Sequence, residues 1–363
     1  MPQEMETAQL NTLIKAANAE WVAGATPLSA LSPQEQQSRL GYAPGPGEES
    51  LEQRIAASTA RIAAVRVSAV GAPAAFDWRN VNGSNYITPI RDQGGCGSCV
   101  SFGTTAAVEG TFRVQRGNPA LAVDLSEASL FFCIGPPSGA SCGNGWYMSP
   151  AMDGYKNTGV PDEACFPYSG HQQACSQCAD WQNRATKITG WHTISAAADM
   201  KTWISTKGPL ATCFTVYNDF FSYTSGVYSH VSGAVAGGHC VCAIGYNDAG
   251  GYWVCKNSWG TSWGESGFFR IAYGQCGIDS TMCAVEGIVE TGWINNVNVV
   301  GLWSIDQDRN AWAYLAGTGW RKIAPDNDNI FFDLLRLLAS AKEGGRPVNV
   351  YQSNGIITQI YVL

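Results

Sequence analysis

The sequence of 363 residues predicts an α+β fold made of two halves, with a helical segment before it and a small β-rich segment after it. Three observations lead to this prediction. One helical pattern, at residues 99–116, precedes a series of short strand-like segments that glycine and asparagine separate. All 13 cysteines lie between Cys96 and Cys283. The two ends of the chain follow patterns of their own, so we expect three parts: residues 1–74, 75–290 and 291–363.

The first part, residues 1–74, is predicted to be helical and loosely packed. One apolar stripe recurs at helical spacing and comprises Leu10, Leu13, Ile14, Ala17 and Trp21. Ser32 and Glu35 fit a capping box with Pro33 at the first helical position. An alanine-rich stretch at residues 51–75 leads to the middle part, and such a segment is open to proteolysis.

The middle part, residues 75–290, begins with a helix and continues with strands. The pattern from Cys99 to Arg116 is helical, and Gly117 stops it. The later segments "GPLATCFTV", "HCVCAIGY", "YWVCKNSW" and "GFFRIAY" are short and typical of strands. This order predicts a helical half followed by a strand-rich half.

The last part, residues 291–363, predicts three strands, a helix and two further strands. The helix at "NIFFDLLRLLASAKEG" ends at Gly344 and Gly345. A turn that contains Asn354 and Gly355 joins the last two strands. A small five-stranded barrel of the OB type is one arrangement that fits this order.

Three tryptophans of the last part admit two interpretations: Trp303, Trp312 and Trp320. In a small barrel, large aromatic side chains most often fill the core. Exposed together on one face, they would instead form a surface for sugar rings. The sequence leaves open whether this part binds a glycan, binds another protein or does neither.

Composition argues against several classes of partner. The net charge of −7 argues against nucleic acid and anionic membranes as the main partners, and no apolar stretch approaches the roughly 20 residues that span a bilayer. The 13 cysteines indicate an oxidising compartment, so we expect a secreted or otherwise exported protein. Their odd number leaves at least one thiol unpaired within the chain. The amino terminus has no signal-peptide pattern, which favours a signal that has been removed.

Cys99 combines the features of a nucleophile. A cysteine attacks only as its thiolate, and the free thiol has a pKa of about 8.5. The start of a helix favours an anion, and Cys99 stands where the predicted helix begins. A nearby imidazolium would lower the thiol pKa further, to about 3.5–7.5. Of the four histidines, His239 stands between two glycines and the strand-like "CVCAIGY", with room for a ligand beside it.

Three further residues fit acyl transfer by a thiol. Asn257 in "KNSWG" offers an amide that holds an imidazole in one tautomer without adding negative charge near a thiolate. Trp259 would exclude water. Gln93 offers a side-chain amide beside the backbone N–H of Cys99, where an oxyanion would develop. One such donor contributes on the order of 10²–10³ in rate.

The stretches "QGGCGSC", "GGHCVCAIGY" and "KNSWG", in this order, resemble the papain-like cysteine peptidases. C-G-S-C is a signature of that family. "FDWRN", "LSEASLFFC" and "CGNGW" resemble further family motifs, and the resemblance extends over about residues 76–288. It implies a two-lobed fold with a helical half and a β-barrel half, and the hydrolysis of protein or peptide substrates without a metal or another cofactor.

The resemblance also implies the roles of the site residues. Cys99 is the nucleophile, His239 the general base and acid, and Asn257 the residue that orients the imidazole. Gln93 completes the oxyanion hole. Five residues are implied to contact the substrate: Gly97, Asn144, Gly145, Trp259 and Thr281.

Two of these contacts are more specific. The backbone of Asn144 and Gly145 would lie along an extended substrate, as in strand addition. Thr281 falls where the family has the floor of the pocket for the second substrate residue. Because Thr281 carries no charge, we expect an apolar or mid-sized side chain there rather than arginine.

The resemblance implies two disulfides, Cys96–Cys142 and Cys133–Cys175, and the chain departs from the family elsewhere. Val100 stands where the family usually has tryptophan. The usual partner of Cys276 is missing. Four cysteines stand where the family does not usually have them: Cys213, Cys240, Cys242 and Cys255. The sequence assigns no partner to these four or to Cys165, Cys178, Cys276 and Cys283.

Residues 1–74 resemble the short propeptide of the cathepsin B subgroup at "NAEWVAGAT" and "QSRLGY". The resemblance implies a zymogen whose own propeptide runs backwards through the cleft and inhibits without being cut. A permanent structural arm is the alternative. The subgroup's occluding loop, with its paired histidines, has no counterpart, because the corresponding stretch holds only His171. We therefore predict endopeptidase action rather than removal of C-terminal dipeptides.

Simpler interpretations exist for the same residues. Four cysteines have the pairwise spacing of a zinc site: Cys96, Cys99, Cys175 and Cys178. Cys99 could instead form a structural disulfide, His239 could be a core histidine and Asn257 a turn former. The alternative function is a catalytically silent binding protein on the same fold, although such a protein would usually have lost the nucleophile.

Overall fold

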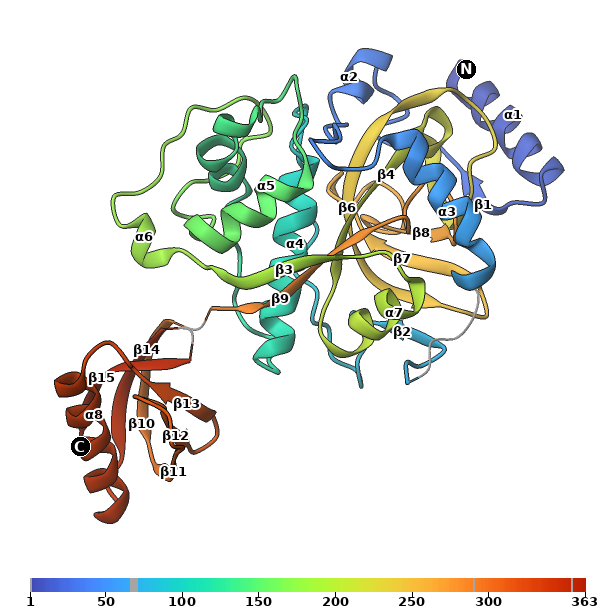
Figure 1. The fold of residues 1–363 in the computed structure, drawn as a ribbon. Helices are drawn as coiled ribbons and strands as arrows, with labels where there is room; N and C mark the ends of the chain where they lie inside the picture. Colours follow the sequence, from blue (N-terminus) through green and yellow to red (C-terminus); the bar gives the residue numbers. More distant parts are fainter. Residues whose placement is uncertain (1, 66–70, 290, 354) are drawn as a thin grey trace. The chain divides into compact units, whose positions relative to one another are not determined.

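The computed structural model describes residues 2–65, 71–289, 291–353 and 355–363 (Figure 1). The chain divides into two compact units, Met1–Ile288 and Val289–Leu363. A search of the described residues finds no helix with the length and apolarity that crossing a bilayer requires.

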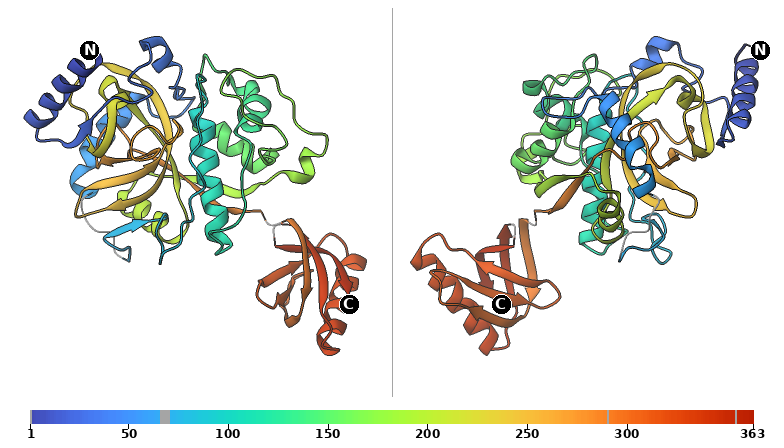
Figure 2. Two further views of the ribbon diagram at one scale, coloured as in Figure 1. Left: turned by 180° about the vertical axis from the view of Figure 1, so that it is seen from behind. Right: turned by 45° about the vertical axis from the view of Figure 1, so that its right-hand side comes forward.

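Helices of the larger unit gather on one side of its sheet, apart from those of the N-terminal segment and α7 (Figures 1 and 2). The α-helices are α1 (Pro2–Ala16), α2 (Pro33–Gln37), α3 (Leu51–Val65), α4 (Cys99–Gln115), α5 (Met148–Asp153), α6 (Trp181–Arg184) and α7 (Ala197–Thr206). Shorter helical turns are η1 (Ser129–Ile134), η2 (Pro136–Ser138), η3 (Gly154–Thr158) and η4 (Asn218–Ser222). Helix α4 is buried from Cys99 to Thr111 and lies between the helical half and the sheet.

The strand-rich half is one nine-stranded sheet in the described part of the chain. Its strands are β1 (Glu20–Ala23), β2 (Ala75–Asp77), β3 (Ile188–Ile194), β4 (Leu210–Tyr217), β5 (Tyr223–Tyr228), β6 (Val235–Asn247), β7 (Tyr252–Lys256), β8 (Phe268–Ala272) and β9 (Met282–Ile288). Their order is β1-β5-β8-β7-β6-β4-β9-β3, with β2 beside β6. The predicted division into a helical and a strand-rich half is confirmed, but the sheet does not close into a barrel over these residues.

The sequence predicts a helical N-terminal segment, but the segment is only partly helical. The capping box is present, with Ser32 and Glu35 bonded reciprocally. Helix α1 ends at Ala16, however, and Trp21 lies in β1, which pairs with β5. The Trp21 ring packs 5.1 Å from that of Tyr228, centroid to centroid. Placing Trp21 on the helical stripe was therefore wrong, because a distant strand decides its conformation.

The smaller unit is a sheet with one helix packed against it. Its elements are β10 (Thr291–Val297), β11 (Val299–Ser304), β12 (Ala311–Leu315), β13 (Gly319–Ile323), α8 (Asp328–Glu343), β14 (Val348–Ser353) and β15 (Ile356–Val362). The order β10-β14-β15-β13-β12-β11 is open over the described residues. The predicted five-stranded barrel of the OB type is not confirmed. The sheet has six strands among the residues that the structure describes, and the sequence pattern did not indicate β10. Helix α8 was predicted correctly and ends before Gly344, whereas the predicted turn residue Asn354 lies outside the described residues.

Several aromatic side chains of the smaller unit lie on the sheet face opposite its core. Trp303 and Trp312 are partners across β11 and β12, and Trp293 and Tyr351 across β10 and β14. Trp293, Trp303 and Trp320 are 49%, 48% and 47% exposed. The interpretation as core residues was therefore wrong for Trp303 and Trp320, whereas Trp312 is half-buried. The core instead uses small and aliphatic residues such as Ala313 and Val350.

Four disulfides connect eight of the cysteines. Cys96–Cys142 and Cys133–Cys175 are the pairs that the resemblance implied. Cys165–Cys178 and Cys213–Cys240 are the pairs that the sequence left unassigned. Five cysteines form no disulfide among the described residues, and all are buried: Cys99, Cys242, Cys255, Cys276 and Cys283. Three of the four cysteines of the zinc interpretation are thus occupied in disulfides.

Candidate active site

Cys99 is the first residue of α4 and is fully buried. Burial raises the pKa of its thiol to about 11, which outweighs the opposing backbone N–H groups of Cys240, Gly41 and Val100. The thiol therefore lies beside the strand that carries His239 and beside the N-terminal segment. In this state it is protonated at neutral pH and is not a nucleophile.

His239 lies in β6 and is also fully buried. Its Nε2 is 2.8 Å from Oδ1 of Asn257. Because the N–H of Ser258 also donates to this oxygen, Nε2 must carry the proton that bonds it. Nδ1 then keeps its lone pair, and it has no hydrogen-bond partner among the described residues. Burial lowers the pKa of His239 to about 4, so the ring is neutral here.

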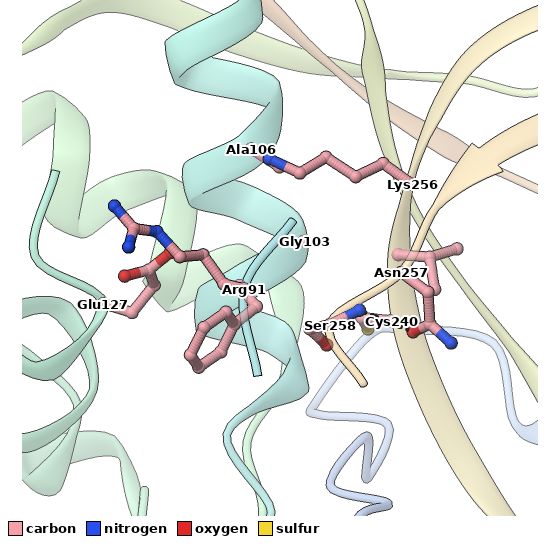
Figure 3. Close-up of a pocket in the computed structure, with 10 residues that line it drawn as sticks. Arg91, Gly103, Ala106, Glu127, Cys240, Lys256, Asn257 and Ser258 are labelled. Atoms are coloured by element: carbon pink, nitrogen blue, oxygen red, sulfur yellow. Dashed lines mark hydrogen bonds between the residues drawn. The ribbon is translucent and has the colours of Figure 1, made fainter. Parts of the chain in front are cut away.

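Trp259 and a buried polar cluster hold the Asn257 side of the site. The Trp259 ring lies 4.6 Å from the imidazole of His239, centroid to centroid, and is 2% exposed. Lys256, the last residue of β7, donates from Nζ to Oγ1 of Thr88 at 2.8 Å. That hydroxyl donates to Glu109 of α4 at 2.6 Å. Figure 3 shows Lys256, Asn257 and Ser258 following one another on the side that faces α4, so this cluster ties the strand to the helix.

Gln93 is fully buried and has all its side-chain bonds inside the protein. Its Oε1 accepts a hydrogen bond from the hydroxyl of Ser258 at 2.7 Å. Its Nε2 donates to the carbonyl of Cys96 at 2.9 Å and to the carbonyl of Arg39 at 3.1 Å. Thus the amide that the sequence assigned to an oxyanion is bonded to a carbonyl of the N-terminal segment.

The N-terminal segment is bonded to both halves beside Cys99. Its Tyr42 N–H donates to the Gly238 carbonyl at 3.0 Å, on the strand side. On the helical side, the Trp146 N–H donates to the Gly41 carbonyl at 2.7 Å, and the Ala43 N–H donates to the Trp146 carbonyl at 3.0 Å. Tyr42 pairs in parallel with Trp146 and antiparallel with Gly238. The segment thus forms a short extra strand between the halves.

Three of the residues predicted to contact substrate lie next to this segment: Gly97, Gly145 and Thr281. Trp259 lies beside His239 instead. A Cβ atom on Gly41 would lie 1.9 Å from the Gly97 carbonyl oxygen, and one on Gly145 would lie 2.1 Å from that of Gly41. Only glycines permit this approach. Thr281 lines a cavity together with Tyr42. Asn144 is exposed at the turn before Gly145, and its only bond given by the structure joins its N–H to Ser141.

Comparison with known proteins assigns the chain to a family. Residues 72–286 match the family described as "Papain family cysteine protease". The chain belongs to the papain family. It is a cysteine-type peptidase by this membership and by its relatives.

Curated relatives in the papain family include cathepsin B-like and cathepsin L-like enzymes. The chain is 40% identical over 228 residues to cathepsin B-like CP3 of Giardia intestinalis, covering 59% of this chain and 74% of that protein. It is 36% identical over 216 residues to a cathepsin L-like proteinase of Fasciola hepatica, covering 57% and 64%. Together with four disulfides, such relatives suggest an oxidising compartment, secreted or lysosomal.

Solved structures of two procathepsins have a similar fold. Procathepsin L 3 of Tenebrio molitor larval midgut has a TM-score of 0.62 at 25% identity, over 78% of this chain and 88% of that chain. Procathepsin B S9 of Trypanosoma congolense has the same TM-score at 22% identity, over 78% and 97%. The papain-like fold is therefore shown.

Sequence reasoning about this papain-family site missed three features. Arg54 of α3 is buried and donates to the carbonyls of Cys213, at 3.1 and 2.6 Å, and of Thr281, at 3.0 Å. The Cys213–Cys240 disulfide lies beside His239. Tyr42 enters the cavity of Thr281. Of these, only Tyr42 could have been found from the sequence, because it ends the stretch "QSRLGY" that resembles a propeptide. Nothing in the local sequence indicates a role for Arg54 or a bond between the two cysteines.

Proposed function

We propose that this protein is the zymogen of a secreted papain-like endopeptidase with a Cys-His-Asn triad. The observation that carries the proposal is the state of the two ring nitrogens of His239: Nε2 is held by Asn257, and Nδ1 has no partner among the described residues and is left for the buried thiol of Cys99. A core histidine would have both nitrogens satisfied or solvated.

The mechanism follows from these atoms. The thiolate of Cys99 attacks the scissile carbonyl carbon, while Nε2 remains bonded to Asn257. The imidazolium of His239 gives its Nδ1 proton to the leaving amine as the C–N bond breaks. Water then attacks the acyl-enzyme and gives a proton to Nδ1. The carboxylate product leaves, and the thiolate and imidazolium are restored.

Gln93 supports the oxyanion step in this proposal. Its Oε1 is fixed by Ser258, and its Nε2 is bonded to the carbonyls of Cys96 and Arg39. The bond from Nε2 to the Arg39 carbonyl occupies this donor in the zymogen. When the segment leaves, Nε2 and the Cys99 N–H are free for a developing oxyanion, where each donor contributes on the order of 10²–10³ in rate.

Residues 1–74 act as the propeptide in this proposal. Three backbone hydrogen bonds hold residues 41–43 between Trp146 and Gly238, where an extended substrate would lie. The segment also buries Cys99 and His239 in their neutral forms. It therefore blocks substrate binding and also the charge separation that catalysis requires. We propose endopeptidase action because the stretch that corresponds to an occluding loop holds one histidine, His171, rather than a pair.

The C-terminal unit is proposed as an accessory binding domain. The exposed faces of Trp303 and Trp320 suit the stacking of sugar rings. Retention of the full chain on insoluble polysaccharide, lost in a Trp303→Ala/Trp320→Ala variant, would support this role. Equal retention of the variant would contradict it.

A thiol-reactive epoxide tests the catalytic proposal. After removal of residues 1–74 from the folded chain, we expect one label, on Cys99, together with peptide hydrolysis that the label abolishes. Cys99→Ser is expected to lose both. Cys276→Ser, which removes another buried free thiol, is the matched control and is expected to keep both. A folded chain that takes up no label on Cys99 would instead support a catalytically silent binding protein.

A further inference from the structure

The cavity beside Thr281 has a wall rich in sulfur. Three of the residues that line its volume of about 360 Å³ are Met148, Cys213 and Cys283. Cys213 is bonded to Cys240, which lies directly opposite it in the pairing of β4 with β6. The disulfide thus bridges the cavity wall to the residue that follows His239. Cysteines at these two positions are among the departures of this chain from its family.

The N-terminal segment forms the other side of this cavity, through residues that include Tyr42, Glu48 and Arg54. Tyr42 lines it and is 5% exposed. Its hydroxyl donates to Glu48 at 3.1 Å, and the Arg54 guanidinium lies 5.8 Å from its ring centroid. The same Arg54 donates to the carbonyl of Cys213. Arg54 of the propeptide therefore contacts the strand that carries Cys213, and the Tyr42 ring lies beside this cation in the same cavity.

Sulfur and aromatic rings attract each other because sulfur is polarisable, and each such contact contributes modestly. Two separate aliphatic side chains on β4 and β6 would form a more deformable pocket wall, because each could change its rotamer independently. A disulfide removes that freedom and presents one fixed surface. A fixed wall favours a flat, rigid side chain over a branched one of similar volume.

On the basis of the proposed function, we infer that the Cys213–Cys240 disulfide is the specificity-determining wall of the pocket for the second substrate residue. It makes that pocket select tyrosine or phenylalanine, which take the place of Tyr42 once the propeptide has left. The second residue is the one that precedes the residue at the scissile bond.

A structural role of the bridge makes a different prediction. Because Cys240 is next to His239, a bridge that only holds β6 against β4 would affect all substrates equally, through kcat. A specificity wall affects the ratio between substrates, chiefly through KM. Peptides that differ only at the second residue separate the two roles.

The experiment compares the activated full-length enzyme with its Cys213→Val/Cys240→Ala variant on peptides with tyrosine, phenylalanine, leucine or valine at that residue. Active sites are counted by epoxide labelling. We expect the tyrosine-to-leucine ratio of kcat/KM to fall about 2- to 10-fold, the range that one or two sulfur–aromatic contacts allow. Cys133→Ala/Cys175→Ala, which removes a disulfide of the helical half, is the matched control and is expected to keep the wild-type ratio.

A variant that fails to fold leaves a second measurement on the wild type. The ratio is determined before and after reduction of Cys213–Cys240, with the free thiols located by mass spectrometry, and the same fall is expected. An unchanged ratio in labelled, active enzyme without the bridge overturns the inference. A wild type that cleaves none of the peptides overturns the proposed function instead.

Discussion

Gly41 provides the sharpest test of autoinhibition by the N-terminal segment. A methyl group on its Cα would lie 1.9 Å from the Gly97 carbonyl oxygen and 2.6 Å from the Gly97 Cα, so backbone must move. Gly41→Ala therefore displaces the segment and puts three backbone hydrogen bonds at risk, those of Gly41, Tyr42 and Ala43. At about 0.5–1.5 kcal/mol each, the loss is about 1.5–4.5 kcal/mol. The open population of the full chain then rises about 10- to 10³-fold.

Epoxide labelling of Cys99 in the uncleaved chain measures that population, because only the open form admits the probe. The labelling rate of Gly41→Ala is expected to exceed that of the wild type by the same factor. Gly143→Ala is the matched control, since its added Cβ meets no atom within 4 Å. Equal labelling rates for Gly41→Ala and the wild type would refute occlusion of Cys99 by this segment.

Three further predictions concern charge and the groups that hold it. Burial raises the pKa of Cys99 to about 11, so the alkylation rate of the full chain should increase only towards that pH. Removal of residues 1–74 should move the inflection of the rate against pH to lower pH, and coincident pH profiles of the two forms would contradict this. Asn257→Ala frees the ring of His239 and should lower kcat about 10²-fold and alter the pH profile, measured on activated enzyme. Lys256→Met removes the cation that favours the ionised form of the buried Glu109, together with the hydrogen bond to Thr88, and should lower the free energy of unfolding in urea by about 1–3 kcal/mol, with partial recovery on adding Glu109→Gln; no recovery would exclude their coupling.

The helix of the nucleophile and the order of the two halves could be predicted because both rest on local patterns. Helix α4 runs from Cys99 to Gln115, within one residue of the predicted stop. Its apolar residues recur over four turns, and Gly117 ends the pattern. The site residues were predicted in the same way, since motifs of a few residues carry each of them. The structure brings Cys99, His239 and Asn257 into one buried region.

Other features depended on contacts that no local pattern contains. Trp21 fitted a helical stripe, yet β5 supplies a strand partner more than 200 residues later, and the chain follows it. Cys213 and Cys240 lie opposite each other only because β4 and β6 pair in that register. A shift of one residue would point the two side chains to opposite faces. The aromatic face of the C-terminal unit was predicted wrongly because the alternation of side chains along a strand defines two faces of the sheet. It does not indicate which of the two faces a helix covers.

In the proposed zymogen, the buried state of Cys99 and His239 gives the N-terminal segment two ways to inhibit. A neutral thiol and a neutral imidazole are the forms that a dry environment favours, and burial moves both pKa values in that direction, to about 11 for Cys99 and about 4 for His239. An ion pair between them needs water or preorganised dipoles around it. Closing the cleft removes the water, while the Arg39 carbonyl takes up the Gln93 donor. On this proposal, departure of the segment restores substrate access, hydration and the oxyanion donor in one step, without a rearrangement of Asn257 or His239.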